Sequence, residues 1–128
     1  MQILAITQDK SLSQIFSEDS ISSTAEFKIF DRTTDPLEVI SMVHSISPNM
    51  LILDDDMLKP NSFRILKSIK QIRENEVIVF LTSDNGLDLG REISPLGVFY
   101  YGIKPITKEE ISDLIKSVST KNKSINYS

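Results

Sequence analysis

The sequence has no cysteine, no tryptophan, four glycines and a single histidine among its 128 residues. Without cysteine the chain forms no disulfide, has no thiolate nucleophile and holds no cysteine-ligated metal or iron-sulfur cluster. The one histidine, His44, cannot build a histidine-rich zinc site. Any metal site in this chain must therefore use oxygen ligands.

The sequence also lacks an excess of positive charge and a long apolar run. Fourteen Lys and Arg residues against eighteen Asp and Glu residues give a formal net charge of −4, which disfavours binding to nucleic acid or to an anionic membrane surface. The amino-terminal segment has neither the basic start nor the apolar stretch of a signal peptide. No apolar run approaches the length of a membrane span. We therefore expect a cytoplasmic protein that binds neither nucleic acid nor a membrane.

The composition that remains is that of one folded domain. A chain of 128 residues, 40% hydrophobic and 25% charged, can bury one core but is too short for two domains. We assign the domain to residues 1–120. Residues 121–128 show no hydrophobic periodicity, and we expect them to form a flexible tail.

Short apolar runs alternate five times with longer amphipathic stretches. The runs are typical of strands buried on both faces, and they cover residues 3–6, 27–30, 50–53, 77–81 and 98–101. The stretches predict helices over residues 10–18, from 35–36 onward, over 62–73, over 87–94 and from 107 onward. Parallel strands need right-handed crossover connections, so the alternation predicts an α/β fold: a single doubly wound (βα)5 domain with a parallel five-stranded sheet in the order 2-1-3-4-5.

Polar residues follow the apolar runs, at the edge where a doubly wound sheet binds its ligands. They are Thr7-Gln8-Asp9, Asp31, Asp54-Asp55-Asp56, Thr82-Ser83-Asp84 and Lys104-Pro105. An aspartate at this edge is a carboxylate nucleophile or a metal ligand, a hydroxyl can donate to a phosphoryl oxygen, and a lysine is a point cation for an anion. Asp54, Thr82 and Lys104 together describe an aspartate that accepts a phosphoryl group.

With these residues the sequence resembles the CheY-like receiver domain of two-component response regulators, over essentially the whole chain from Gln2 to Val118. The spacings of 28 residues from Asp54 to Thr82 and of 22 residues from Thr82 to Lys104 are usual in that family. The resemblance implies a phosphoprotein of a phosphorelay, in which a histidine kinase or a phosphotransfer protein phosphorylates Asp54.

The resemblance also implies roles for the other site residues. Thr82 matches the hydroxyl that moves toward the phosphoryl group, and Lys104 matches the lysine that pairs with that group. Tyr101 matches the aromatic residue whose rotamer reports the switch. The face formed by the fourth helix, the fifth strand and the fifth helix would then contact a downstream protein or a second copy of the chain.

The first strand departs from the family pattern, because Thr7 and Gln8 stand where receivers have the acidic pair that holds Mg²⁺. This metal is bound chiefly by carboxylate oxygens, and Gln8 keeps an oxygen without the charge. The resemblance thus implies an atypical receiver with a weak Mg²⁺ site made by Asp9, Asp54 and Asp56. Two compensations stay open: Asp9 turning into the site, or the acids after Asp54 binding the metal through water.

Alternatives remain for the acceptor and for the function. Asp56 precedes Pro60 at a spacing that also suits a receiver, and it is the less favoured acceptor. A second function is that of a pseudo-receiver, a phosphorylation-independent module for protein interaction or dimerisation, which Thr7 and Gln8 favour. A nucleotide-dependent enzyme is disfavoured because no glycine-rich loop follows the first strand, so we expect no enzyme.

Each site feature also has an ordinary explanation. An aspartate triplet after a strand is usually a solvated turn. Thr82 alone could cap the next segment, Lys104 could be a surface cation and Tyr101 could be part of the core. It is their joint position at the ends of the third, fourth and fifth strands that favours the receiver interpretation.

Overall fold

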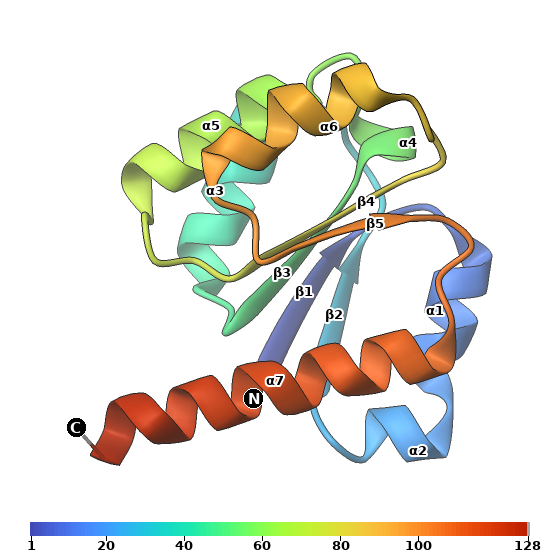
Figure 1. Cartoon of the computed structure of the whole chain (residues 1–128), viewed down its shortest axis with the longest axis vertical. Helices are drawn as coiled ribbons and strands as arrows, with labels where there is room; N and C mark the ends of the chain where they lie inside the picture. Colours follow the sequence, from blue (N-terminus) through green and yellow to red (C-terminus); the bar gives the residue numbers. More distant parts are fainter. Residues whose placement is uncertain (128) are drawn as a thin grey trace.

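The computed structural model describes the backbone of residues 1–127 and the side chains of residues 1–120, and in it a parallel sheet lies between two layers of helices (Figure 1). The strands are β1 (Gln2–Ile6), β2 (Glu26–Phe30), β3 (Met50–Asp54), β4 (Ile78–Thr82) and β5 (Tyr100–Ile103). They pair in parallel in the order β2-β1-β3-β4-β5. The predicted fold class and strand order are confirmed.

The helices lie on both faces of the sheet. They are α1 (Lys10–Ser17), α2 (Asp19–Ser22), α3 (Pro36–Ile46), α4 (Asp55–Leu58), α5 (Ser62–Ile72), α6 (Leu87–Ile93), the 3-10 helix η1 (Ser94–Leu96) and α7 (Lys108–Tyr127). Helices α1, α2 and α7 cover one face, and α3, α5 and α6 cover the other (Figure 1). The short helix α4 directly follows β3.

Alternation along the strands divides the core into two halves. In β1, Ile3 and Ala5 pack toward α1 and α7, whereas Leu4 and Ile6 pack toward α3 and α5. The central strands β3 and β4 are buried at every position, as expected for strands covered by helices on both faces. Because successive side chains point to opposite faces, the same alternation decides which side of the sheet each residue at the strand ends faces.

Three of the strands, β2, β4 and β5, differ from the predicted ones in their ends or their burial. The strand predicted over 98–101 is β5, shifted to Tyr100–Ile103, because its ladder pairing with β4 begins at Tyr100, opposite Val79. The strand predicted over 77–81 is likewise β4 at Ile78–Thr82. The predicted burial of the second strand on both faces is wrong: β2 is an edge strand with exposed residues such as Glu26 and Lys28. An edge strand is covered less than a central one, whatever its apolar content.

The helix predictions differ mainly at their ends. The helix predicted over 10–18 ends at Ser17 and is followed by the separate turn α2. The helix predicted to Arg73 ends at Ile72, whose side chain is 58% exposed. Ile72, the last residue of α5, therefore does not join the buried stripe of Ile65 and Ile69.

The last helix begins with the predicted capping box. The Thr107 hydroxyl accepts the Glu110 N–H at 3.1 Å, and the Thr107 N–H donates to the Glu110 carboxylate at 3.4 Å. The helix continues to Tyr127, but the side chains of residues 121–128 lie outside the described part, and the flexible tail stays a prediction. Among the described residues no helix, α7 included, is both long enough and apolar enough to cross a bilayer.

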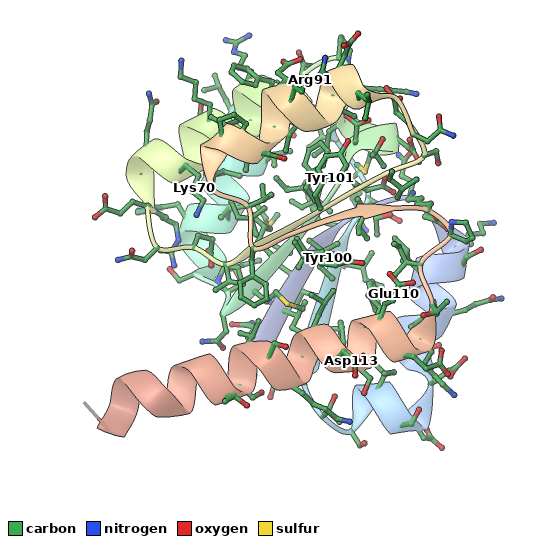
Figure 2. All side chains as sticks on the ribbon, viewed as in Figure 1. Lys70, Arg91, Tyr100, Tyr101, Glu110 and Asp113 are labelled. Carbon is green, nitrogen blue, oxygen red and sulfur yellow. The ribbon has the colours of Figure 1, made fainter. Side chains whose placement is uncertain are left out.

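The two tyrosines of β5 point to opposite faces of the sheet (Figure 2). Tyr100 lies on the side of α7, where its hydroxyl donates to Glu110 at 2.9 Å. This hydrogen bond, together with burial, raises the pKa of Tyr100. Tyr101 lies on the side of α6 and stacks on Phe80 with ring centroids 5.6 Å apart. Strand β5 is thus fixed to both helical layers by aromatic side chains.

Substitution of Gly102, on the Tyr100 side of the sheet, tests the packing of β5. A Cβ atom at Gly102 would come within 2.8 Å of both the Leu81 and Tyr100 side chains, whereas one at Gly90 in α6 would be 3.9 Å from Tyr101. Gly102→Ala should therefore lower the free energy of unfolding by about 1–3 kcal/mol. The control Gly90→Ala should leave it unchanged or raise it by about 0.4–1 kcal/mol. Urea denaturation followed by circular dichroism measures both, and equal effects of the two variants would contradict this packing.

Candidate functional site

The polar residues at the strand ends meet at one edge of the sheet, and alternation sorts them into two groups. Thr7, Asp54 and Lys104 continue the positions of β1, β3 and β5 that face α1 and α7. Thr82 continues the positions of β4 that face α5 and α6, and Asp55 lies one residue beyond Asp54 on that side. The hydrogen bonds of the site follow this division.

Lys104 is the centre of the first group. Its ammonium lies 2.8 Å from Asp54 Oδ2, 2.9 Å from Asp9 Oδ2 and 3.1 Å from Asp56 Oδ2. The side chain of Lys104 is 12% exposed and that of Asp54 is 2% exposed, against 25% and 28% for Asp9 and Asp56. One cation thus neutralises part of the charge of three converging carboxylates in a half-buried position.

Burial and Lys104 act in opposite directions on the acids. Burial alone raises the pKa of Asp9 and Asp56, but hydrogen bonds and the charge of Lys104, with the Ser83 bonds for Asp56, hold the pKa of both carboxyls below the ordinary value. Burial would lower the pKa of Lys104, yet the bonds to Asp54 and Asp9 and the charge of Asp54 raise it well above its usual range. The Lys104 ammonium and the carboxylates of Asp9 and Asp56 therefore keep their charges over a wide range of pH.

Asp54 has two further donors besides Lys104. The Thr7 hydroxyl donates to Asp54 Oδ2 at 2.6 Å, and the backbone N–H of Asp56 donates to Asp54 Oδ1 at 3.0 Å. Thr7 is fully buried. A residue that stands in place of an acid thus acts as a hydrogen-bond donor to the proposed acceptor, which sequence reasoning did not predict.

The other two residues after β1 have different positions. The Asp9 carboxylate reaches the site through one oxygen, while its other oxygen caps α1 by accepting the N–H of Ser11 at 2.9 Å. Asp9 therefore turns into the site, where it contacts the Lys104 ammonium; its role as a metal ligand stays a prediction. The Gln8 amide instead donates to the carbonyl of Asp31 at 2.9 Å. Gln8 joins the loops after β1 and β2, and among the described residues no hydrogen bond links its side chain to Asp54.

Thr82 does not donate to Asp54. Its hydroxyl donates to Asp55 Oδ2 at 2.8 Å, and the Ser62 hydroxyl donates to Asp55 Oδ1 at 2.6 Å. All three side chains are buried, so the expectation of a solvated turn does not hold for Asp55. The strand period of two could have found this partnership, because it places Asp54 and Asp55 on opposite faces.

Asp56 joins the two neighbouring strand ends. Its carboxylate accepts the Ser83 hydroxyl at 2.6 Å and the Ser83 N–H at 3.2 Å, and it also contacts Lys104. Ser83 was one of the strand-end residues noted in the sequence, but nothing in the pattern pointed to this bond.

The acids do not fit a divalent metal as they are arranged. Mg²⁺ takes oxygen ligands, and Asp9, Asp54 and Asp56 do supply oxygens of that kind. These oxygens surround the Lys104 ammonium instead. Within the described part of the chain, no group of three or more acidic or histidine side chains is disposed to hold a metal ion.

Tyr101 lies beside the second group. Its phenol oxygen is buried and has no hydrogen-bond partner among the described residues. Burial, with smaller contributions from the charges of Asp84 and Asp55, raises the pKa of Tyr101. Figure 2 shows the ring between the sheet and α6. The contact with Phe80 and the position near Asp55 place Tyr101 within reach of changes at the end of β4.

A cavity of about 920 Å³ lies at the amino-terminal ends of the strands, opposite the polar residues described above. Arg73 there pairs with Glu76 at 3.1 Å and donates to Ser47, and Lys70 donates to the carbonyls of Glu74 and Glu76. Lys70, Arg73 and Glu76 are thus engaged with one another, with Ser47 and with the backbone. We therefore assign the functional site to the carboxyl ends of the strands.

Comparisons with known proteins agree with this geometry. No protein-family profile matches the chain. A structure of a response regulator receiver domain protein from Clostridium thermocellum has a TM-score of 0.76, with 24% identity, and covers 97% of this chain and 98% of that one. A CheY-like receiver domain protein from Methanospirillum hungatei has a TM-score of 0.77, with 16% identity, and covers 96% and 97% of the two chains. The chain has the CheY-like receiver-domain fold.

A curated relative points the same way. The chain is 30% identical over 80 residues to sporulation initiation phosphotransferase F of Bacillus subtilis. The matched region covers 62% of this chain and 64% of the relative. The matched region therefore spans less than two thirds of the relative's length. In the receiver-domain fold of the present chain, the site described above occupies the edge at which doubly wound sheets bind ligands.

The lysine-centred group generates a pH-dependent prediction. Lys104→Met leaves three carboxylates facing one another, so at pH 7 the free energy of unfolding should fall by about 2 kcal/mol, between the values for exposed and for buried pairs. Because the pKa values of Asp9 and Asp56 are lowered in the folded protein, these carboxylates stabilise the fold above about pH 4. That stabilisation is lost as the pH falls through the folded-state pKa values. The difference in the free energy of unfolding between Lys104→Met and the wild type should therefore disappear toward about pH 3.

An exposed lysine provides the control. Lys108 pairs with Glu18 at 3.2 Å with both side chains more than 40% exposed, and Lys108→Met should change stability by less than about 0.5 kcal/mol at any pH. Urea midpoints measured from pH 3 to 8 compare the two variants. A loss in Lys104→Met that does not depend on pH would contradict the electrostatic role of Lys104.

Proposed function

We propose that the chain is a receiver domain of a two-component system that accepts a phosphoryl group on Asp54 in the cytoplasm, from a histidine kinase or a phosphotransfer protein. The observation that carries the proposal is the position of Asp54 at the carboxyl end of a central strand, 2.8 Å from the Lys104 ammonium. The name of the sporulation phosphotransferase to which the chain is similar supports transfer of a phosphoryl group.

In the proposed reaction, a carboxylate oxygen of Asp54 attacks the phosphorus of the donor. The bond between phosphorus and the donor's nitrogen or oxygen breaks, its electron pair leaves with the donor, and Asp54 becomes an acyl phosphate. Lys104 offsets the negative charge that collects on the phosphoryl oxygens. Thr7, whose proton now points to Asp54, can donate to the same oxygens.

Asp54 is the favoured acceptor because its oxygens contact Lys104 and Thr7 in a site from which water is largely excluded. Asp56 remains the alternative, since its side chain is 28% exposed and also contacts Lys104. Its oxygens are, however, engaged by the Ser83 hydroxyl and N–H. A donor reaching Asp56 would have to displace these bonds.

The proposed Mg²⁺ affinity is low. A divalent ion among Asp9, Asp54 and Asp56 would have to displace the Lys104 ammonium, which these oxygens already bind at 2.8–3.1 Å. Thr7 and Gln8 add no carboxylate charge after the first strand. In the proposed reaction Lys104 and Thr7, and not a metal ion, are therefore the groups that bind and orient the Asp54 carboxylate.

The proposed output surface is the face of α6, β5 and α7 near Tyr101. Leu87 and Ile103 are 72% and 45% exposed there, beside an open cleft of about 670 Å³ that Tyr101 and Gly90 also line. Thr82 and Lys104 lie at the ends of β4 and β5, which lead into this face. A downstream protein or a second copy of the chain would bind here.

A second candidate function is that of a phosphorylation-independent pseudo-receiver. It is favoured by the same contacts that weaken the metal site: Lys104 already neutralises Asp54, and Thr7 already donates to it. In that case the fold would serve as an interaction module in one fixed state.

Labelling with a small phosphodonor separates the two functions. Acetyl phosphate should add one phosphoryl group to the wild-type protein, and Asp54→Asn should abolish this, because the amide is not a nucleophile. The matched variants Asp55→Asn and Asp56→Asn should still be labelled. Intact-mass spectrometry reports each result. Absence of labelling in the wild type favours the pseudo-receiver, and labelling that is lost only in Asp56→Asn makes Asp56 the acceptor.

Restoring the acidic residues should strengthen metal binding. Gln8→Asp adds a carboxylate after β1 and should increase Mg²⁺ affinity by a free energy of about 1–3 kcal/mol, and Thr7→Asp combined with Gln8→Asp should increase it further. Asp31→Asn is the control, because Gln8 contacts only the Asp31 backbone in that loop. Calorimetric titration with Mg²⁺ measures the affinity. Tight binding by the wild type, or no gain in a folded Gln8→Asp variant, would refute a weakened site.

A further inference from the structure

Asp55 is a buried carboxylate that the proposed phosphoryl transfer does not use. It is 4% exposed and begins α4 directly after β3. Each of its oxygens accepts one hydroxyl, from Ser62 at 2.6 Å and from Thr82 at 2.8 Å. Within the described residues Asp55 takes part in no ion pair. Its buried oxygens therefore depend on the two hydroxyl donors for their hydrogen bonds.

Thr82 has only one proton to donate, and it donates it to Asp55. The Thr82 oxygen also accepts the N–H of Asp84 at 3.0 Å, so the hydroxyl is engaged both as donor and as acceptor. Asp54 receives the hydroxyl of Thr7 instead. Each of the two adjacent aspartates thus accepts a hydrogen bond from a different threonine, and the two bonds lie on opposite sides of the sheet.

The surroundings make the bond between Thr82 and Asp55 hard to replace. Thr82 is fully buried, so a water molecule does not readily take its place on Asp55. Ser62, the other donor, begins the 11-residue helix α5, whose amino-terminal end favours a negative charge nearby. Asp55 consequently ties the end of β4 to the start of α5.

We propose that Asp55 is the positioning residue of Thr82: it holds the hydroxyl on the α5 and α6 side of the sheet, so that Thr82 contacts a phosphoryl group on Asp54 only after leaving Asp55. The second half rests on the proposed function, and the first half does not. Asp55 and the group on Asp54 then compete for one proton. Removing Asp55 should favour the arrangement that binds the phosphoryl group.

A double-mutant cycle tests the first half without any phosphoryl transfer. Asp55→Leu and Thr82→Val replace each partner by an apolar side chain of nearly the same shape. Each should lower the urea midpoint, and the double variant should lose no more than the larger single loss, because the buried partner is no longer left unpaired. In the matched cycle of Asp54→Leu with Thr82→Val, the losses should add. Additive losses for Asp55 and Thr82, or non-additive losses for Asp54 and Thr82, overturn the proposal.

Thr82→Ala and Thr82→Ser keep the test decisive if Thr82→Val does not fold. Serine retains the hydroxyl, so Asp55→Leu should lower the urea midpoint of the Thr82→Ser protein as much as that of the wild type. Alanine removes the hydroxyl, so Asp55→Leu should lower the midpoint of the Thr82→Ala protein by less. Ser62→Ala with Asp55→Leu is a positive control for a hydroxyl that donates to Asp55. An equal midpoint loss for Asp55→Leu in the Thr82→Ser and Thr82→Ala proteins contradicts the assignment.

Labelling with acetyl phosphate tests the second half. Asp55→Leu should speed labelling of Asp54 about three- to tenfold, a gain that loss of structure would not produce. The gain should disappear in Asp55→Leu with Thr82→Val, since no hydroxyl is then released. Unchanged or slower labelling in Asp55→Leu, or a gain that persists in the double variant, overturns this half. If the wild type is not labelled at all, the proposed function fails, and the cycles still decide the role of Asp55.

Discussion

Three carboxylates at the ends of two strands converge on one ammonium, and the arrangement of the site depends on that cation. At such distances like charges repel strongly unless a counter-charge lies between them. Lys104 provides it, and β5 in turn fixes Lys104 because Tyr100 and Tyr101 anchor that strand to opposite helical layers. The hydrogen bonds from Ser83, together with Lys104, then hold the pKa of Asp56 below its ordinary value in a partly buried position. Packing at the sheet edge and charge balance in the site are thus linked through one strand.

The fold was predictable to a large extent because it follows from hydrophobic periodicity. The fivefold alternation of apolar runs and amphipathic stretches predicted the sheet order, and the capping box at Thr107 predicted the start of α7. The exposed character of β2 was missed, since periodicity reports apolar content and an edge position depends on the order of strands in the sheet. The shift of β5 has a similar origin: ladder pairing with β4, and not the apolar run itself, determines its ends.

The site was predicted in its position but only partly in its contacts. Which strand ends meet follows from topology, so the convergence of Asp54 and Lys104 could be expected. The aspartate that each hydroxyl binds depends on the face of the sheet to which the side chain points. Spacing along the chain matches Thr82 to Asp54, whereas its face directs the hydroxyl to Asp55. Thr7 was regarded as the loss of an acid, whereas its hydroxyl donates to Asp54. The side chain of Gln8 follows a loop contact that no sequence pattern describes.

The separation of the site residues along the chain has a consequence for folding. Thr7 and Asp54 are 47 residues apart, and Asp54 and Lys104 are 50 apart. Every strand pairing in this parallel sheet crosses an intervening helix, so no local hairpin brings any two of these side chains together. The contacts of Lys104 with Asp54 and Asp9 form only when strands from the beginning, middle and end of the domain have joined. The intact site is therefore a marker of the completely folded domain.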